Sequence, residues 1–97
     1  MTVCFVLPGH GMDAASMEEL VTLSFRNKYP FVHFEFLEAP GLSWYKYIME
    51  YDGDKEDEVC PIYEEQMTQH LLNHMQAFNC DWICIGLSEG GCMALNL

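Results

Sequence analysis

A glycine-flanked serine, Ser88, directly follows an apolar run and limits the folds that are open to the chain. Residues 82–85 are Trp-Ile-Cys-Ile, and residues 86–90 are Gly-Leu-Ser-Glu-Gly, a G-x-S-x-G pattern. At the end of a buried strand, this pattern places the serine on a tight strand-to-helix turn, where its hydroxyl stands clear of the sheet. Such a turn is crowded two residues before and two residues after the serine, which explains Gly86 and Gly90. The sequence therefore predicts a strand, a sharp turn and the start of a helix around Ser88.

The composition fits one small, packed domain. The chain has 97 residues, of which 51% are apolar, and this suits a single domain with a modest core. No apolar run approaches the roughly 18 residues that would span a bilayer, so no membrane span is expected. The formal net charge of −11 would repel a phosphate backbone. We therefore expect no nucleic-acid partner.

The five cysteines predict free thiols and no zinc site. Their number is odd, and no two of them form a C-x-x-C pair. Cys4, Cys84 and Cys92 lie in apolar runs, where a free cysteine behaves as a small hydrophobic residue. The apolar run over residues 1–7 has no basic leader and is interpreted as a strand, not a signal peptide. We therefore expect a reducing compartment and a cytoplasmic location.

Three apolar runs predict the strands of one sheet. They cover residues 2–7, 31–37 and 82–85, where Val, Ile and Phe are frequent. Helical patterns separate them, so the order is strand, helix, strand, helix, strand. This order predicts a parallel sheet with right-handed crossovers and helices packed against it. The fold class is therefore α/β, with a three-stranded parallel sheet in a single domain over residues 1–97.

Two helical patterns lie between these strands. Ser16, followed by Glu19 three residues later, fits a capping box that would begin the first helix. The second helix is expected over residues 64–78, where apolar residues recur with the period of an α-helix. The expected inward positions are Met17, Leu20, Val21 and Ser24 in the first helix and Met67, Leu71, Met75 and Phe78 in the second.

Other candidate ligand-binding patterns are interpreted as surface features. The acidic run over residues 50–58 does not fit a calcium loop, because Asp57 stands where an EF-hand needs glycine. His70 and His74 have a spacing that can hold a metal ion, but no H-E-x-x-H pattern or third ligand accompanies them. His33, within the second strand, is interpreted as a structural or solvent-facing residue. We therefore expect no metal and no cofactor.

A glycine-rich turn over residues 8–11, Pro-Gly-His-Gly, follows the first strand. Such a turn frees backbone N–H groups, which an oxyanion-binding site needs. A simple strand-to-helix turn is the alternative interpretation. A flavodoxin-like phosphate loop is less favoured, because neither G-x-x-x-x-G-K-[ST] nor G-x-G-x-x-G is present.

With both turns placed, the chain resembles the carboxylesterase/lysophospholipase branch of the α/β-hydrolases, the branch that contains the acyl-protein thioesterases. Residues 7–11, Leu-Pro-Gly-His-Gly, stand where that family has a His-Gly-x-Gly turn. Residues 38–41, Glu-Ala-Pro-Gly, resemble its Asn-Ala-Pro, and Trp44-Tyr45 resembles its Trp-Phe/Tyr-Asp. Residues 86–91, Gly-Leu-Ser-Glu-Gly-Gly, resemble its nucleophile elbow, Gly-Phe-Ser-Gln-Gly-Gly. The resemblance covers only part of a complete family domain.

The resemblance implies a role for each matching residue. Ser88 would be the nucleophile, and the backbone N–H groups of His10 and Glu89 would form the oxyanion hole. Gly86 and Gly90 would be the elbow glycines. The implied fold is a partial α/β-hydrolase that ends just after the elbow, with the first strand between the other two. The implied substrate is an acyl ester or thioester, and no cofactor is needed.

The sequence also departs from the family pattern. Pro8 replaces a histidine, Lys46 replaces an aspartate and Glu89 replaces a glutamine. A carboxylate at Glu89 would oppose a developing oxyanion. The family's triad runs Ser, Asp, His along the chain, but no Asp or His follows Ser88. His10 is the upstream histidine that could reach Ser88.

These departures leave two expectations for function. The first is the N-terminal half of a serine hydrolase, inactive by itself because the triad Asp and His are missing. The second is a catalytically inactive remnant that acts as a binding module. Three strands with a short third helix leave sheet edges uncovered, so self-association through these edges is also expected.

Overall fold

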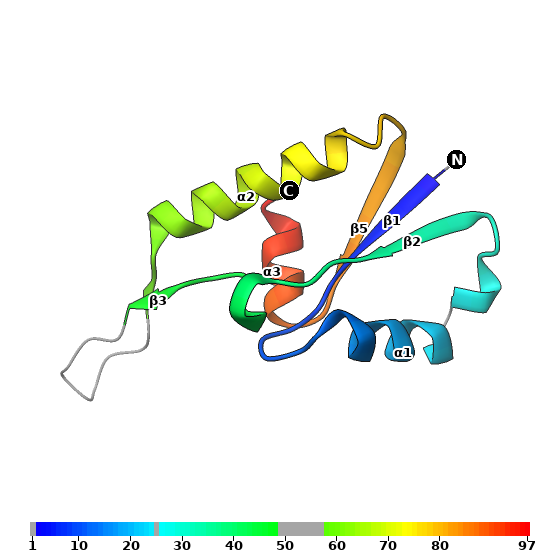
Figure 1. Cartoon of the computed structure of the whole chain (residues 1–97), viewed down its shortest axis with the longest axis horizontal. Coiled ribbons are helices and arrows are strands. Elements are labelled where there is room, and N and C mark those ends of the chain that lie inside the picture. Colours follow the sequence, from blue (N-terminus) through cyan, green and yellow to red (C-terminus); the bar gives the residue numbers. More distant parts are fainter. Residues whose placement is uncertain (1, 25, 49–57) are drawn as a thin grey trace.

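The central element is β1 (Thr2–Leu7), which lies between β2 (Val32–Phe36) and β5 (Asp81–Gly86) and is parallel to both. The computed structural model describes residues 2–24, 26–48 and 58–97. It confirms the predicted three-stranded parallel sheet and the position of the first strand (Figure 1). Leu7 is in register with Gly86, so β1 and β5 end at the same edge of the sheet. The turns that follow these two strands therefore begin side by side.

Successive side chains of β1 enter two different apolar cores. Val3, Phe5 and Leu7 are fully buried on one face, and Cys4 and Val6 are buried on the other. This alternation follows from the pleat of the strand, which turns neighbouring side chains to opposite faces. Both faces of β1 are therefore covered, as expected for a strand in the middle of a parallel sheet.

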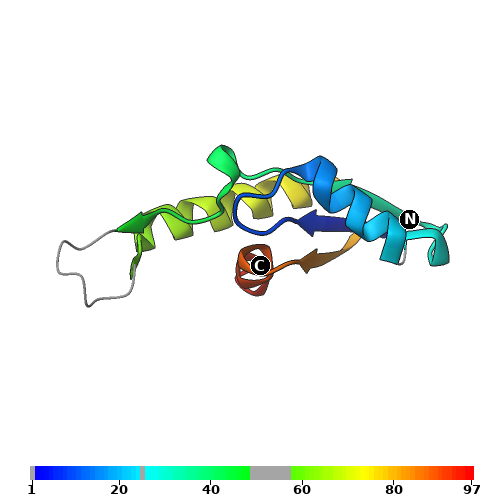
Figure 2. The same cartoon turned by 90° about the horizontal axis from the view of Figure 1, so that it is seen from below.

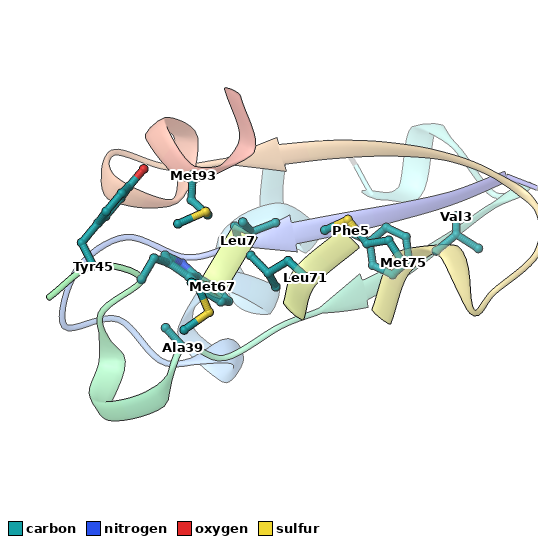
Figure 3. Close-up of a cluster of buried hydrophobic side chains, with 10 residues drawn as sticks. Val3, Phe5, Leu7, Ala39, Tyr45, Met67, Leu71, Met75 and Met93 are labelled. Carbon is teal, nitrogen blue, oxygen red and sulfur yellow. The ribbon is translucent and has the colours of Figure 1, made fainter. Parts of the chain in front are cut away.

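The helix α2 (Pro61–Gln76) covers the face that carries Phe5. Its buried residues are Met67, Leu71 and Met75, as predicted (Figure 3). The helix begins at Pro61 and not at residue 64, because proline lacks the N–H that the first turn leaves unpaired. Phe78 lies beyond the helix end, and its ring packs edge-on against Phe5 with centroids 5.1 Å apart.

The helix α1 (Ala14–Ser24) packs on the opposite face of the sheet. The buried residues of this second core are Cys4, Val6, Met17, Val21 and Phe34. Leu20 and Ser24, predicted to point inward, are exposed, and Leu20 is 42% accessible to solvent. The inward stripe of α1 is therefore narrower than its sequence predicted.

The predicted N-cap of α1 is wrong. Ser16 lies inside the helix, and its N–H donates to Oδ1 of Asp13 at 2.8 Å. Asp13 therefore caps the helix, because its carboxylate satisfies an N–H of the first turn. The hydrogen bonds from Ser16 lower the pKa of Asp13.

The second strand is shorter than the predicted 31–37, since β2 covers Val32–Phe36. His33 is exposed, as expected, and it pairs with the carboxylate of Glu35 on the same side of the strand. The two histidines of α2, His70 and His74, are also exposed.

The connection between β2 and α2 contains little regular structure. It holds the 3₁₀ turn η2 (Pro40–Leu42) and then two-residue strands, whereas the 3₁₀ turn η1 (Arg26–Lys28) lies earlier, between α1 and β2. These strands, β3 (Tyr47–Ile48) and β4 (Glu58–Val59), pair antiparallel. Most of the acidic run over 50–58 lies outside the described residues, so its interpretation as a solvated loop stays a prediction. Within the described part of the chain, no helix has the length and apolarity needed to cross a membrane.

Candidate active site

Ser88 sits on a strained turn between β5 and α3 (Glu89–Leu95). Its φ is 54° and its ψ is −115°, a backbone conformation that side chains with a Cβ rarely adopt. Holding a residue in such a region costs roughly 1–3 kcal/mol and requires support from the surrounding structure. The serine is exposed at the C-terminal edge of the sheet. This is the strand–turn–helix context that the sequence around Ser88 predicted.

Two glycines make this turn possible. A Cβ added at Gly86 would lie 2.3 Å from the carbonyl oxygen of Gly90. A Cβ added at Gly90 would lie 2.2 Å from the carbonyl oxygen of Leu7 and 2.4 Å from that of Pro8. All three distances are far inside van der Waals contact, so the turn can close only with glycine at these positions.

The glycine-rich turn over residues 8–11 lies beside the serine turn. A Cβ added at Gly9 would be 3.2 Å from the carbonyl oxygen of Leu87 and 3.6 Å from the Cβ of Ser88. Both views of the molecule show this turn, in blue, next to the orange start of α3 (Figure 1 and Figure 2). The two turns that the sequence singled out therefore form one site, although nearly the whole chain separates them.

The segment after β2 fixes the shape of the glycine-rich turn. The N–H of Gly11 donates to the carbonyl oxygen of Leu42 at 2.7 Å, and Gly11 has a φ of 73°. The indole N–H of Trp44 donates to the carbonyl oxygen of Pro8 at 2.9 Å, and the Trp44 side chain is buried. These bonds satisfy backbone groups that the tight turn would otherwise leave unpaired.

Two backbone donors at the site are unpaired within the described residues. Neither the N–H of His10 nor that of Glu89 donates to a protein acceptor there. Glu89 is the first residue of α3, where a helical N–H has no acceptor within the helix. Such donors can bind an anionic oxygen.

The carboxylate of Glu89 is buried and holds the site together. Only 7% of the residue is accessible to solvent. Its oxygens accept hydrogen bonds from the Trp44 N–H at 2.5 Å, the Tyr47 hydroxyl at 2.7 Å, His10 Nδ1 at 3.0 Å and the Ser43 hydroxyl at 3.1 Å. Burial by itself would raise the pKa of Glu89, but these hydrogen bonds outweigh it and lower the pKa below its usual value. The carboxylate is therefore charged at neutral pH.

This role of the Glu89 side chain was missed by sequence reasoning, which considered its charge only as unfavourable for a developing oxyanion. A signal was present, because a glutamate stands where the resembling family has a glutamine. Four donors from two segments, the glycine-rich turn and residues 43–47, bind this carboxylate in the structure. The carboxylate therefore links α3 to the glycine-rich turn and to residues 43–47.

Two tyrosines form one wall of the site. The hydrogen bond from Tyr47 to Glu89, followed by burial, raises the pKa of the Tyr47 hydroxyl to about 12. Burial, together with the nearby Glu64, raises the pKa of Tyr45 to about 12. Asn96 donates to Glu64 at 2.8 Å and lies 3.4 Å from the Tyr45 hydroxyl. In Figure 3, Tyr45 lies at one end of the buried cluster, away from Val3.

The two turns and the tyrosine wall border a cleft of about 720 Å³. The residues that line it include His10, Tyr45, Tyr47, Val59, Ser88, Glu89, Cys92 and Leu95. Cys92 is exposed, which corrects its interpretation as a core residue, whereas Cys4 is buried as expected. Burial raises the pKa of the Cys4 thiol to about 11. Among the described residues, no cluster of three His, Cys, Asp or Glu side chains could hold a metal ion.

The chain was compared with protein-family models, with curated proteins and with solved structures, and none of the three comparisons finds a match. The function must therefore be inferred from the residues of the cleft and from their geometry.

Proposed function

We propose that the chain carries the nucleophile and the oxyanion-binding turn of a serine hydrolase that cleaves carboxylic ester or thioester bonds. The observation that carries this proposal is the conformation of Ser88, which stands on a strained turn at the strand tip inside a cleft. Strain of this kind persists only where the surrounding structure supports it, and it is typical of functional sites. In this proposal the fold is a partial α/β-hydrolase fold.

The chemistry would be acyl transfer followed by hydrolysis. The Ser88 hydroxyl attacks the carbonyl carbon, and the oxyanion that forms accepts hydrogen bonds from the unpaired N–H groups of His10 and Glu89. The alcohol or thiol then leaves, and water hydrolyses the acyl-Ser88 ester. No metal or cofactor is required for these steps.

The resemblance to the carboxylesterase, lysophospholipase and acyl-protein thioesterase branch favours an acylated or lipid-like substrate. The cleft is consistent with this class, because Val59, Leu95 and the Tyr45 ring give it apolar walls. Apolar walls with a few polar groups at one end are typical of small-molecule sites.

A serine-reactive fluorophosphonate probe tests the proposal. We expect the protein isolated from its source to be labelled at Ser88, as located by mass spectrometry of its peptides. Ser88→Ala should abolish labelling, while Ser24→Ala, at an exposed hydroxyl in α1 outside the cleft, should keep it. Absence of Ser88 labelling in the isolated protein would overturn the hydrolase proposal.

A second candidate function, a binding module that associates through its sheet edge, is favoured by the apolar surface along β5. Ile83 is 51% exposed and Leu87 is 41% exposed. Leu87 and Leu20 also line an apolar groove of about 310 Å³ between α1 and β5. Light scattering should then detect a dimer that Ile83→Lys converts to a monomer. A monomeric wild-type protein at high concentration would exclude self-association through this edge.

A further inference from the structure

The contact between His10 and Glu89 determines which nitrogen of the His10 imidazole carries the proton. His10 Nδ1 lies 3.0 Å from Oε2 of Glu89. A carboxylate that is charged can only accept hydrogen bonds, so Nδ1 must carry the proton in this contact. In the neutral imidazole, the other nitrogen, Nε2, then has a free lone pair and is the basic atom.

We propose that His10, oriented by Glu89, is the general base for Ser88. This inference rests on the proposed serine hydrolase function and adds to it a base from within the described chain. The arrangement differs from the order of the resembling family, because the base precedes the nucleophile and the orienting carboxylate follows it directly.

The position of Glu89 is rigid enough for this role. Its carboxylate is buried, and Trp44, Tyr47 and Ser43 each donate a hydrogen bond to it besides His10. A carboxylate fixed in this way sets the orientation of the imidazole, as buried carboxylates do for catalytic histidines. The Tyr47 ring adds a second constraint, because it meets the His10 ring edge-on with centroids 6.1 Å apart.

The position of His10 also suits a base for Ser88. The two residues line the same cleft, and the turn that carries His10 contacts the serine turn through Gly9. The His10 side chain is 65% exposed and lines the cleft, so its imidazole is accessible to a substrate. No other histidine in the described part of the chain lines this cleft.

In the proposed reaction, Nε2 of His10 accepts and returns every proton that is transferred. As the Ser88 oxygen bonds to the substrate carbonyl carbon, its proton passes to Nε2 of His10. When the tetrahedral intermediate collapses, the bond to the leaving oxygen or sulfur breaks, and Nε2 returns the proton to that atom. Water then attacks the acyl-serine, gives one proton to Nε2 and releases the carboxylic acid, after which Nε2 reprotonates Ser88.

The first test reads the tautomer of His10 directly and needs no activity. Nitrogen chemical shifts of the ¹⁵N-labelled chain, measured at about pH 9 where imidazoles are neutral, should show His10 protonated at Nδ1. Glu89→Gln should shift the population toward the Nε2–H tautomer, because an amide can donate to Nδ1. The shifts of His33, which pairs with Glu35 outside the cleft, should not change. A wild-type His10 with its proton on Nε2 would overturn the proposal.

The second test measures the rate of Ser88 labelling by the fluorophosphonate probe. His10→Ala should lower the rate by about 100-fold or more, because a general base typically contributes roughly 10²- to 10⁴-fold. Added imidazole should restore part of the rate in this variant, which a merely structural loss would not allow. His33→Ala is the matched control and should react at the wild-type rate. Thermal unfolding of each variant should show that the fold is kept.

The outcomes separate the two proposals. Labelling of Ser88 at an unchanged rate in His10→Ala would overturn the role of His10 and leave the serine hydrolase proposal intact. Absence of Ser88 labelling in the protein isolated from its source would overturn both.

Discussion

The backbone of Gly90 lies against the carbonyl oxygen of Leu7, so close that a Cβ at Gly90 would be 2.2 Å from that oxygen. This contact joins the first turn of α3 to the end of the central strand. Because β1 continues directly into the turn over residues 8–11, the same contact brings Ser88 beside that turn. The geometry of the cleft therefore depends on a position where no side chain fits.

The first prediction concerns these glycines. Gly90→Ala should lower the free energy of unfolding by about 3 kcal/mol or more, because the methyl group would overlap backbone atoms that cannot move independently. Gly86→Ala should have a similar effect, since its Cβ would lie 2.3 Å from the Gly90 carbonyl. Urea unfolding followed by circular dichroism measures both.

Gly91→Ala is the matched control for the glycine prediction. It lies in the same helix, and its Cβ would be 3.3 Å from the carbonyl oxygen of Gly86, a contact that small shifts relieve. Alanine also favours the helix by roughly 1 kcal/mol over glycine. Equal losses of stability at Gly90 and Gly91 would contradict the prediction, because they would show that the close contact of Gly90 with Leu7 has no special effect.

The second prediction concerns the strain at Ser88. Its φ of 54° and ψ of −115° disfavour any residue with a Cβ, and glycine adopts such conformations readily. The free energy of unfolding of Ser88→Gly should therefore exceed that of Ser88→Ala by about 1 kcal/mol, although both remove the hydroxyl. Ser88→Gly should accordingly unfold at a higher urea concentration. If the two variants were equally stable, the turn would be unstrained in solution.

The fold could be predicted from the sequence where local pattern and tertiary packing agree. The uncharged run in β1 and the stripe of Met67, Leu71 and Met75 in α2 are such cases, because burial decides both. The N-cap of α1 was missed because Asp13 and Ser16 both suit an N-cap. Which of them caps the helix depends on the path of the chain after the turn over residues 8–11.

The side-chain contacts of the site were harder to predict than its backbone. The pattern around Ser88 predicted the sharp turn, because the backbone of such a turn leaves no room for a Cβ two residues before and two residues after the serine. The Glu89 carboxylate accepts from donors more than 40 residues away, such as Trp44, and no local pattern encodes that contact. Sequence reasoning assigned the charge of Glu89 correctly, but only the fold supplies the partners that stabilise it.

The third prediction uses the lowered pKa of Glu89. A carboxyl whose pKa is lower in the folded than in the unfolded chain stabilises the fold above its unfolded pKa, and this stabilisation is lost as the pH falls. Glu89→Gln should therefore be less stable than wild type at pH 7, by about 1–3 kcal/mol for lost hydrogen bonds to a charged group. The difference should shrink as the pH falls below the ordinary value of 4.5.

Urea unfolding of both proteins between about pH 3 and pH 7 measures this difference across the ordinary carboxyl range. Glu18→Gln is a suitable control, because Glu18 forms an exposed pair with Arg26 and such pairs contribute little. A difference between wild type and Glu89→Gln that stays constant with pH would contradict a charged, hydrogen-bonded Glu89.

The last prediction concerns the thiol at the cleft. Cys92 is exposed and lines the cleft beside Ser88, whereas burial raises the pKa values of Cys4 and Cys84 to about 11. Because the thiolate is the reactive form, a maleimide at about pH 7 should modify Cys92 well before Cys4 or Cys84, as peptide mass spectrometry would show. The adduct should also slow fluorophosphonate labelling of Ser88, since it occupies the cleft. Cys92→Ser should keep Ser88 labelling and make it insensitive to maleimide; inhibition that persists in this variant would place the responsible thiol outside the cleft.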